Sequence, residues 1–91
     1  MNDTDNSEKL AGYREQIDRI DQQLLELLNE RARVALQVGI AKGGQNIHRP
    51  EREAEVLANV TDTNKGPLAN EAVQTIFRKI IEVCRTIQLT K

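Results

Sequence analysis

The sequence predicts an all-α protein with three helices in each chain, one long and two shorter. Apolar residues recur at alternating steps of three and four along about residues 8–42, which is the spacing of one face of an amphipathic helix. Two later segments, at about residues 50–60 and 68–88, return to helical spacing after clusters of turn-forming residues. Aromatic residues make up only 2% of the chain, and this shortage argues against β-strands, which favour aromatic and β-branched side chains.

The first predicted helix runs from about Glu8 to Lys42 without a proline. It would hold roughly 35 residues and measure about 50 Å, a length that suggests coiled-coil-like pairing. Residues 1–7 are polar and are expected to form a flexible N-terminal segment, so that the single domain covers residues 8–91. Nine positions of the repeating stripe are apolar and one is an arginine: Leu10, Tyr13, Ile17, Ile20, Leu24, Leu27, Arg31, Val34, Val38 and Ala41.

The two shorter helices follow from turn residues and spacing. The run 43–46, which contains two glycines, is expected to end the first helix. Pro50 suits the first turn of the second helix, and a polar turn over residues 61–66 follows it. The third helix is expected from about Leu68 or Asn70 to near Gln88. Its core-facing residues form two adjacent stripes: Val73, Ile76, Ile80, Val83 and Ile87, and Phe77, Ile81, Cys84 and Gln88.

Composition excludes several classes of protein. The chain carries 13 basic and 14 acidic residues, a formal net charge of −1, which argues against a nucleic-acid binder that works by bulk charge. We find no apolar run of membrane-spanning length and no secretory signal. One cysteine cannot form an intrachain disulfide, and one histidine with one cysteine argues against a zinc site. We therefore expect a cytoplasmic protein without a metal site.

A single copy of the chain cannot cover the apolar side of its long helix along the whole length, because small domains bury too little surface alone. We therefore expect a homodimer in which the long helices of two copies pack together. Arg14 lies 17 residues before Arg31, about 25 Å away along the helix and on a different face. In an antiparallel pair, Arg14 of one copy would approach Arg31 of the other; the alternative is a solvated surface cation.

Arg31 is the strongest indication of function, because an ionised guanidinium inside an apolar stripe needs an anionic partner and cannot lose its proton. The partner is either a carboxylate of the protein or one carried by a ligand. Lys42 follows 11 residues later, about 16 Å along the helix, and points within roughly 20° of Arg31. The two cations could hold a small molecule between them, and the alternative for each is exposure to water.

Four further residues are candidates for the same site. Glu53 shares a stripe with apolar residues and could accept hydrogen bonds from ligand hydroxyls, or it is an ordinary first-turn glutamate. Arg52 beside it either orients the site or faces water. Gln88 is an amide in a core-facing stripe and would need partners if buried. Cys84 has no evident base, since the one histidine is in a loop, and a packed thiol is the simpler interpretation.

The sequence contains neither a glycine-rich phosphate loop nor a serine-hydrolase motif. A pocket of fixed cations and amides suits an anionic small molecule, held either for binding or for a reaction driven by positioning and electrostatics.

In order and spacing, these residues resemble the all-helical class of chorismate mutases, especially the domain at the N-terminus of bifunctional mutase–prephenate dehydratases. The resemblance covers about residues 9–88. It is carried by five segments: Tyr13 to Asp18 with Arg14, Glu30-Arg31-Ala32, Val38 to Lys42, Arg49 to Ala54, and Ile80 to Gln88.

The resemblance implies an intertwined homodimer with two sites, each built from both chains, that converts chorismate to prephenate without a cofactor in phenylalanine and tyrosine biosynthesis. Arg31 and the partner chain's Arg14 would hold the substrate's two carboxylates. Lys42 and Gln88 would donate to the ether oxygen, where negative charge develops as the C–O bond breaks. Glu53 would hold the ring hydroxyl, and Arg52 would line the site.

Two positions depart from the resemblance. Arg49 stands where many members carry an aspartate that contacts the ring hydroxyl, and Cys84 stands where some carry a serine that assists a carboxylate. We still expect both residues to contribute to substrate binding. Gln88 donates at any ordinary pH, whereas members with glutamate there need it protonated, so the resemblance predicts a broad pH profile.

Two other functions remain open from the sequence. A relative of the same fold, an isochorismate pyruvate-lyase, uses much the same cationic pocket. A non-catalytic helical dimerisation or regulatory domain would use Arg31 to fix the helix register. That last interpretation leaves Lys42, Glu53 and Gln88 without a purpose.

Overall fold

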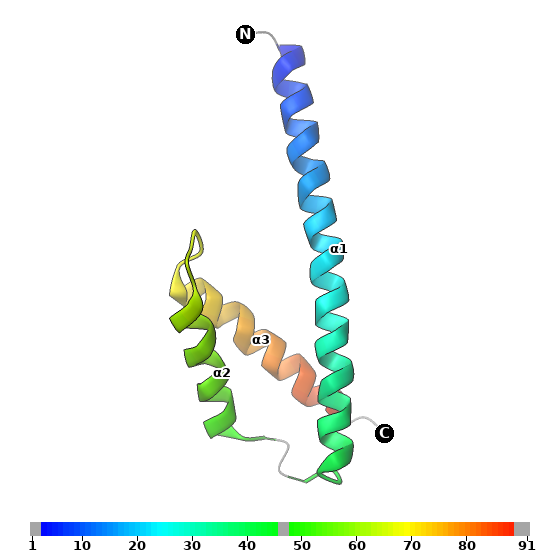
Figure 1. The fold of residues 1–91 in the computed structure, drawn as a ribbon, viewed down its shortest axis with the longest axis vertical. Coiled ribbons are helices and arrows are strands. Elements are labelled where there is room, and N and C mark those ends of the chain that lie inside the picture. The colour runs from blue at the N-terminus through cyan, green and yellow to red at the C-terminus, as the bar shows by residue number, and fades with distance from the viewer. Residues whose placement is uncertain (1–2, 46–47, 89–91) are drawn as a thin grey trace. The chain divides into compact units, whose positions relative to one another are not determined.

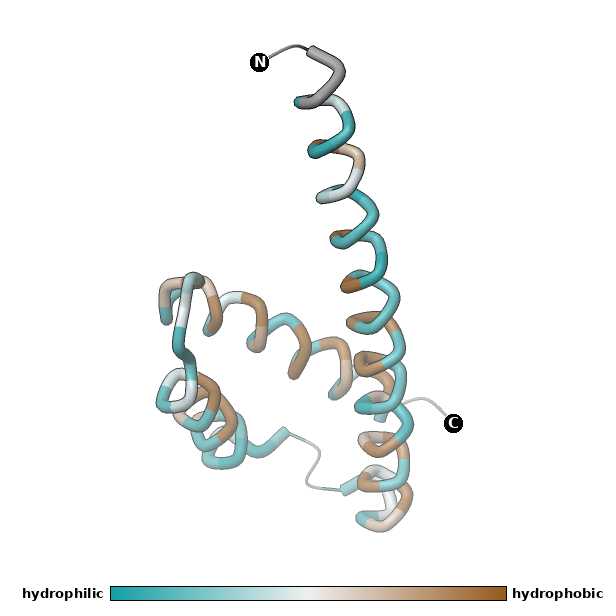
Figure 2. Tube along the Cα trace, turned by 45° about the horizontal axis from the view of Figure 1, so that its top comes forward, coloured by the Kyte–Doolittle hydropathy of each residue, from teal (hydrophilic) through white to brown (hydrophobic). Residues whose placement is uncertain are grey.

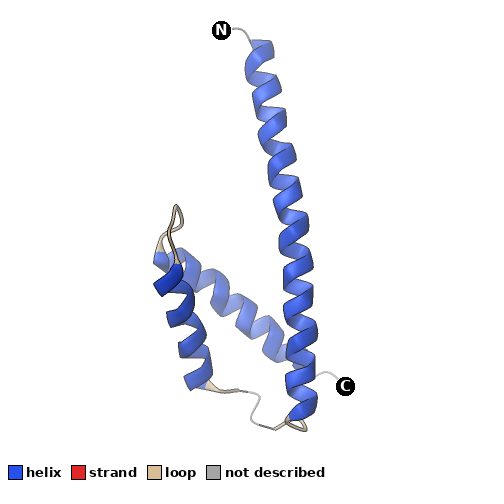
Figure 3. Ribbon diagram, viewed as in Figure 1, coloured by secondary structure: helices blue, strands red, loops and turns tan. Residues whose placement is uncertain are grey.

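The computed structural model describes residues 3–45 and 48–88, and every regular element in these ranges is an α-helix (Figure 1, Figure 3). The long helix α1 covers Asp3–Ala41, α2 covers Pro50–Thr63, and α3 covers Asn70–Gln88. The prediction of an all-α chain with one long and two shorter helices is confirmed. The chain divides into two compact units, residues 1–30 and residues 31–91, and α1 belongs to both. None of the described helices combines the length and apolar character that crossing a membrane requires.

The start of α1 differs from the prediction. The helix begins at Asp3, five residues before the predicted Glu8, so residues 3–7 are helical. No proline or glycine precedes Gly12, and a helix that has already formed extends at little cost through such a sequence. The predicted flexibility of residues 1–7 stays a prediction, and the first two residues lie outside the described ranges.

The end of α1 is fixed by two glycines. The Gly44 amide donates to the carbonyl of Gly39 at 3.1 Å, and the Gly43 amide donates to the carbonyl of Ile40 at 3.0 Å. These are the two bonds of a Schellman cap, which needs a left-handed residue just after the helix. Gly43 supplies it with φ of 63°, and Gly44 follows with φ of 79°. The cap therefore ends α1 where the sequence predicted and leaves Lys42 at its C-terminus.

Within residues 3–30 the described structure consists of α1 alone, and its large apolar side chains are exposed. Apolar segments recur along the helix in Figure 2, at the spacing expected from the sequence. Their exposed fractions run from 42% to 61%: Leu10, Tyr13, Ile17, Ile20, Leu24, Leu25, Leu27 and Leu28. We call these eight residues the apolar stripe of α1.

Residues 31–91 contain the small core. Helix α2 packs against α3, and the buried apolar side chains come from α1 and α3: Ala35, Val73, Ile81 and Cys84. Asn64 organises the connection between α2 and α3, because its Nδ2 donates to the carbonyl of Leu68 and its Oδ1 accepts from the Gly66 amide. This core holds the facing ends of the three helical segments around a cavity.

Candidate functional site

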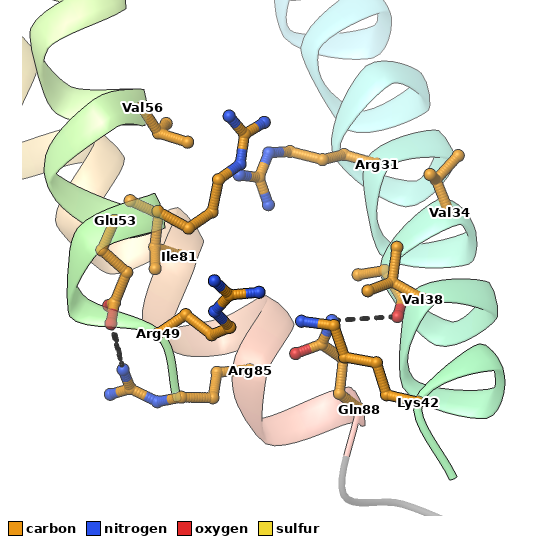
Figure 4. Close-up of a pocket in the computed structure, with 12 residues that line it drawn as sticks. Arg31, Val34, Val38, Lys42, Arg49, Glu53, Val56, Ile81, Arg85 and Gln88 are labelled. Atoms are coloured by element: carbon orange, nitrogen blue, oxygen red, sulfur yellow. Dashed lines mark hydrogen bonds and ion pairs between the residues drawn. The ribbon is translucent and has the colours of Figure 1, made fainter. Parts of the chain in front are cut away.

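A cavity of about 310 Å³ lies within residues 31–91, a size that suits a small metabolite (Figure 4). Its wall is formed by the last turns of α1, the first turns of α2 and the last turns of α3. Five lining side chains are cationic, one is a carboxylate, one is an amide and five are apolar: Arg31, Lys42, Arg49, Arg52 and Arg85; Glu53; Gln88; and Val34, Ala35, Val38, Val56 and Ile81.

The structure brings Arg31 and Lys42 to the same cavity, as the helical spacing predicted. Both residues are half-buried. In Figure 4, Arg31 extends from α1 toward α2, and Arg49 extends from the start of α2 toward α1. The lining carries a formal charge of +4 from its five cations and one carboxylate. This balance suits a ligand with more than one negative charge.

Arg49 reaches the cavity because of its place at the N-cap of α2. Its backbone is extended, with φ of −121° and ψ of 91°, and its side chain makes no capping hydrogen bond. Its carbonyl accepts the first helical bond, from the Glu53 amide at 3.0 Å, while Pro50 occupies the first helical position. The backbone thus directs the guanidinium into the cavity, and the role in substrate binding that we expect for Arg49 stays a prediction.

Gln88 is held by the last turns of α1. Its Nε2 donates to the carbonyl of Ala35 at 3.1 Å, which satisfies one of its two N–H groups. This close approach depends on Gly39, which is buried: a Cβ there would lie 3.1 Å from the Gln88 carbonyl oxygen and 3.3 Å from the Gln88 Cβ. The bond to a carbonyl also fixes which end of the amide is the nitrogen. A second N–H is left to donate within the cavity.

Glu53 is held by two groups from outside α2. Nη1 of Arg85 donates to Oε1 at 2.9 Å and to Oε2 at 3.1 Å, and His48 Nε2 lies 3.1 Å from Oε2. The Glu53 side chain is 27% exposed and the Arg85 side chain 31% exposed, so the contact is partly shielded from water. A charge-assisted contact of this kind orients both partners.

Sequence reasoning missed Arg85. It lies four residues after Ile81 and three before Gln88, on the face of α3 that lines the cavity, and that spacing could have identified it. Reasoning from sequence also considered His48 only as a base for Cys84, whereas the structure places it against Glu53.

Arg52 and Cys84 are placed differently from one another. Arg52 lines the cavity and also pairs with Glu55 one turn along α2, so it both borders the site and faces water. Cys84 is a free thiol, 7% exposed, and is not part of the cavity lining. Its short side chain is used in the core, which fits the alternative of a packed thiol, and we assign it no contact with a ligand.

Arg14 lies in the unit of residues 1–30, where it is exposed on α1. It does not line the cavity of residues 31–91. Within residues 3–45 and 48–88, no group of three or more His, Cys, Asp or Glu side chains is arranged to hold a metal ion. The described site therefore offers cations, an amide and one carboxylate.

Comparison with known proteins points to one family. Residues 13–89 match the family described as chorismate mutase type II. The chain is 44% identical over 81 residues to a bifunctional chorismate mutase/prephenate dehydratase of Neisseria gonorrhoeae, covering 89% of this chain and 22% of that protein. It is 41% identical over 87 residues to the protein of the same name from Aquifex aeolicus, covering 89% of this chain and 24% of that protein. The chain thus spans about a quarter of the length of these curated relatives.

Two solved structures share the fold. A chorismate mutase from Thermus thermophilus superposes with a TM-score of 0.86 at 28% identity, covering 91% of this chain and 97% of the other. A chorismate mutase from Helicobacter pylori, crystallised in complex with prephenate, superposes with a TM-score of 0.84 at 27% identity, covering 89% of this chain and 90% of the other.

Proposed function

The chain belongs to the chorismate mutase type II family, and on this premise we propose that it catalyses the rearrangement of chorismate to prephenate, a step of phenylalanine and tyrosine biosynthesis in the cytoplasm. The observation that carries the proposal is the cavity that Arg31, Lys42 and Gln88 line together. A non-catalytic dimerisation domain would not need these three groups at one cavity. The family membership favours the mutase over the lyase of the same fold.

The reaction needs neither a nucleophile nor a proton transfer. The ether C–O bond of chorismate breaks while a C–C bond forms in the same molecule, so the product is an isomer and no atom enters or leaves. Chorismate must first fold into a compact conformer with its side chain over the ring. Fixed cations on two sides of a small cavity favour that conformer, because they hold both carboxylates in one arrangement.

Arg31 would bind one carboxylate of the substrate, and Lys42 with Gln88 would donate to the ether oxygen. Negative charge develops on that oxygen in the transition state, where donors fixed in advance lower the barrier without having to reorganise. The Gln88 amide is fixed by its bond to Ala35 and keeps one N–H for this purpose. Glu53 would accept a hydrogen bond from the ring hydroxyl. Arg49 adds a cation to the field that attracts the dianion.

We propose further that two copies form an intertwined homodimer with sites shared between the chains. The support is the apolar stripe of α1, whose members are 42% to 61% exposed in a single copy. A second copy would cover this stripe and remove it from water, which is the main driving force of such association. It would also bring its own Arg14 to the second carboxylate of the substrate.

The proposal is tested by following the loss of chorismate absorbance with the purified chain, beside Arg31→Ala and Lys42→Ala. Removing one donor of this kind lowers kcat by about 10²- to 10³-fold in other enzymes, and we expect a loss on that order in either variant. Lys65→Ala, on the exposed loop after α2, serves as the matched control and should keep the wild-type rate. Near-normal turnover in Arg31→Ala or Lys42→Ala would contradict the proposed function. A dimer that converts isochorismate and leaves chorismate unchanged would instead indicate the lyase.

A further inference from the structure

Glu53 supplies the one carboxylate among the described residues that line the cavity, and its position is set by a residue on another helix. Arg85 lies 32 residues later, on α3, and a single nitrogen of its guanidinium contacts both oxygens of Glu53, at 2.9 Å and 3.1 Å. Figure 4 shows the Arg85 side chain reaching from α3 to the carboxylate on α2. The contact therefore fixes the carboxylate relative to α3, from which Gln88 also lines the cavity.

The environment distinguishes this contact from the other arginine–glutamate pair on α2. Arg52 and Glu55 are 62% and 61% exposed, so water competes for both groups and the pair contributes little. Arg85 and Glu53 are 31% and 27% exposed, and their bonds join separate helices. The pair of Arg85 and Glu53 is thus the one that restricts the orientation of a carboxylate.

The contacts also leave a defined place for a ligand. An ionised carboxylate has about four acceptor positions, two on each oxygen. In the described part of the chain, Oε2 of Glu53 meets both Arg85 and His48, whereas Oε1 meets Arg85 alone. One acceptor position thus remains, on Oε1. A neutral hydroxyl donor is a ligand group that fits an acceptor already in contact with the Arg85 guanidinium.

We propose that Arg85 is a positioning residue that holds Glu53 in place to accept a hydrogen bond from the ring hydroxyl of the substrate, and that it thereby sets selectivity for the hydroxylated ring. This inference rests on the proposed function. If Arg85 only joined α3 to α2, replacing it would lower stability and affect all substrates alike. If Arg85 positions Glu53, replacing it lowers the preference for the substrate that carries the ring hydroxyl.

The test compares chorismate with an analogue that lacks the ring hydroxyl. The measured quantity is kcat/KM for chorismate divided by kcat/KM for the analogue. It is determined for the wild type, Arg85→Met, Arg85→Lys and Arg78→Ala. Methionine keeps much of the apolar stem of arginine, which limits the loss of packing. Arg78 is an exposed arginine earlier on α3 and outside the cavity lining, so its variant is the matched control.

We expect Arg85→Met to lower the ratio by about tenfold, the order expected for a weakened hydrogen bond to a charged acceptor. Arg85→Lys should recover part of the ratio, because it keeps the charge but lacks the guanidinium's fixed geometry. Arg78→Ala should leave both rates unchanged. In a Glu53→Gln background, Arg85→Met should change the ratio little further, because the two residues act on the hydroxyl as one unit.

An Arg85→Met enzyme that keeps the wild-type ratio, even with a lower melting temperature, would overturn the inference and leave the proposed function standing. The inference would also be overturned if Arg85→Met lowered the ratio by the same factor in the Glu53→Gln background as in the wild type, because Arg85 would then act without Glu53. A wild-type chain that does not convert chorismate would overturn the proposed function itself, and the inference with it.

Discussion

The two units of the chain differ in whether their side chains find partners within the same copy. In the described part of residues 31–88, two polar groups of the cavity are held by neighbours in the same copy: Gln88 by Ala35, and Glu53 by Arg85 and His48. In residues 6–30, the apolar stripe of α1 stays about half exposed. One copy thus arranges its own cavity, while the apolar stripe of α1 is the part of the chain that the proposed dimer would cover. In the proposed dimer, the dependence on a second copy comes from the N-terminal half of α1.

The largest effect is expected from a charge in the apolar stripe. Leu24 is 51% exposed in one copy, and in the proposed dimer Leu24→Glu would place a carboxylate in the apolar interface of each chain. The free energy of dimer formation would lose about 1.5–3 kcal/mol of leucine burial for each copy, and the cost of desolvating the charge adds to this loss. We expect monomers in sedimentation experiments and loss of turnover.

Gln23→Glu is the matched control, because it adds the same group one residue earlier, outside the stripe. It should leave the dimer and its activity intact. A Leu24→Glu chain that remains a fully active dimer would show that the stripe of α1 is not the interface.

A smaller and pH-dependent effect is expected at Gln88, within the C-terminal unit. A glutamate there can donate a hydrogen bond only when protonated, and an unperturbed glutamate has a pKa of about 4.3. Gln88→Glu should therefore lose turnover as pH rises above that range, and the ionised form would also meet the carbonyl of Ala35 that now accepts from the amide. The wild type should keep its kcat over the same range. A wild-type kcat that falls sharply above neutral pH would contradict the role of the amide.

The smallest effect is expected at Gly39, which acts on the site through Gln88. The added Cβ of Gly39→Ala would lie 3.1 Å from a backbone oxygen of Gln88, so the end of α3 must shift by a few tenths of an ångström. Because transition-state stabilisation depends on position, we expect kcat to fall by about tenfold, with a smaller change in KM.

Gly12→Ala is the control for helix propensity. A Cβ at Gly12 meets nothing within 4 Å, and alanine favours the helix by about 1 kcal/mol over glycine. This variant should be as active as the wild type and slightly more stable. Equal kinetics for the two variants would show that the close approach at Gly39 does not position Gln88.

The sequence predicted the helices because their spacing and breaking residues are local features. Pro50 and the pair of glycines at 43 and 44 mark boundaries that the structure keeps, while the extra turn of α1 before Glu8 lacked any boundary signal. Arg31 and Lys42 could be placed together because both belong to one helix. The bond between Arg85 and Glu53 could not, since it joins residues 32 apart on different helices. Cations are also common in the last turn of a helix, where they interact favourably with the helix dipole. The position of Arg85 in the last turn of α3 therefore did not by itself indicate a site residue.

In the proposed dimer, each site needs Arg31 of one copy and Arg14 of the other. The direct measurement mixes an Arg14→Ala chain with an Arg31→Ala chain, each nearly inactive alone, under conditions in which dimers exchange subunits. A mixed dimer then has one site with both substitutions and one with neither. Random pairing should restore about a quarter of the wild-type sites, and turnover should rise to match. A mixture that forms mixed dimers by native mass spectrometry, yet is no more active than its components, would contradict the shared site.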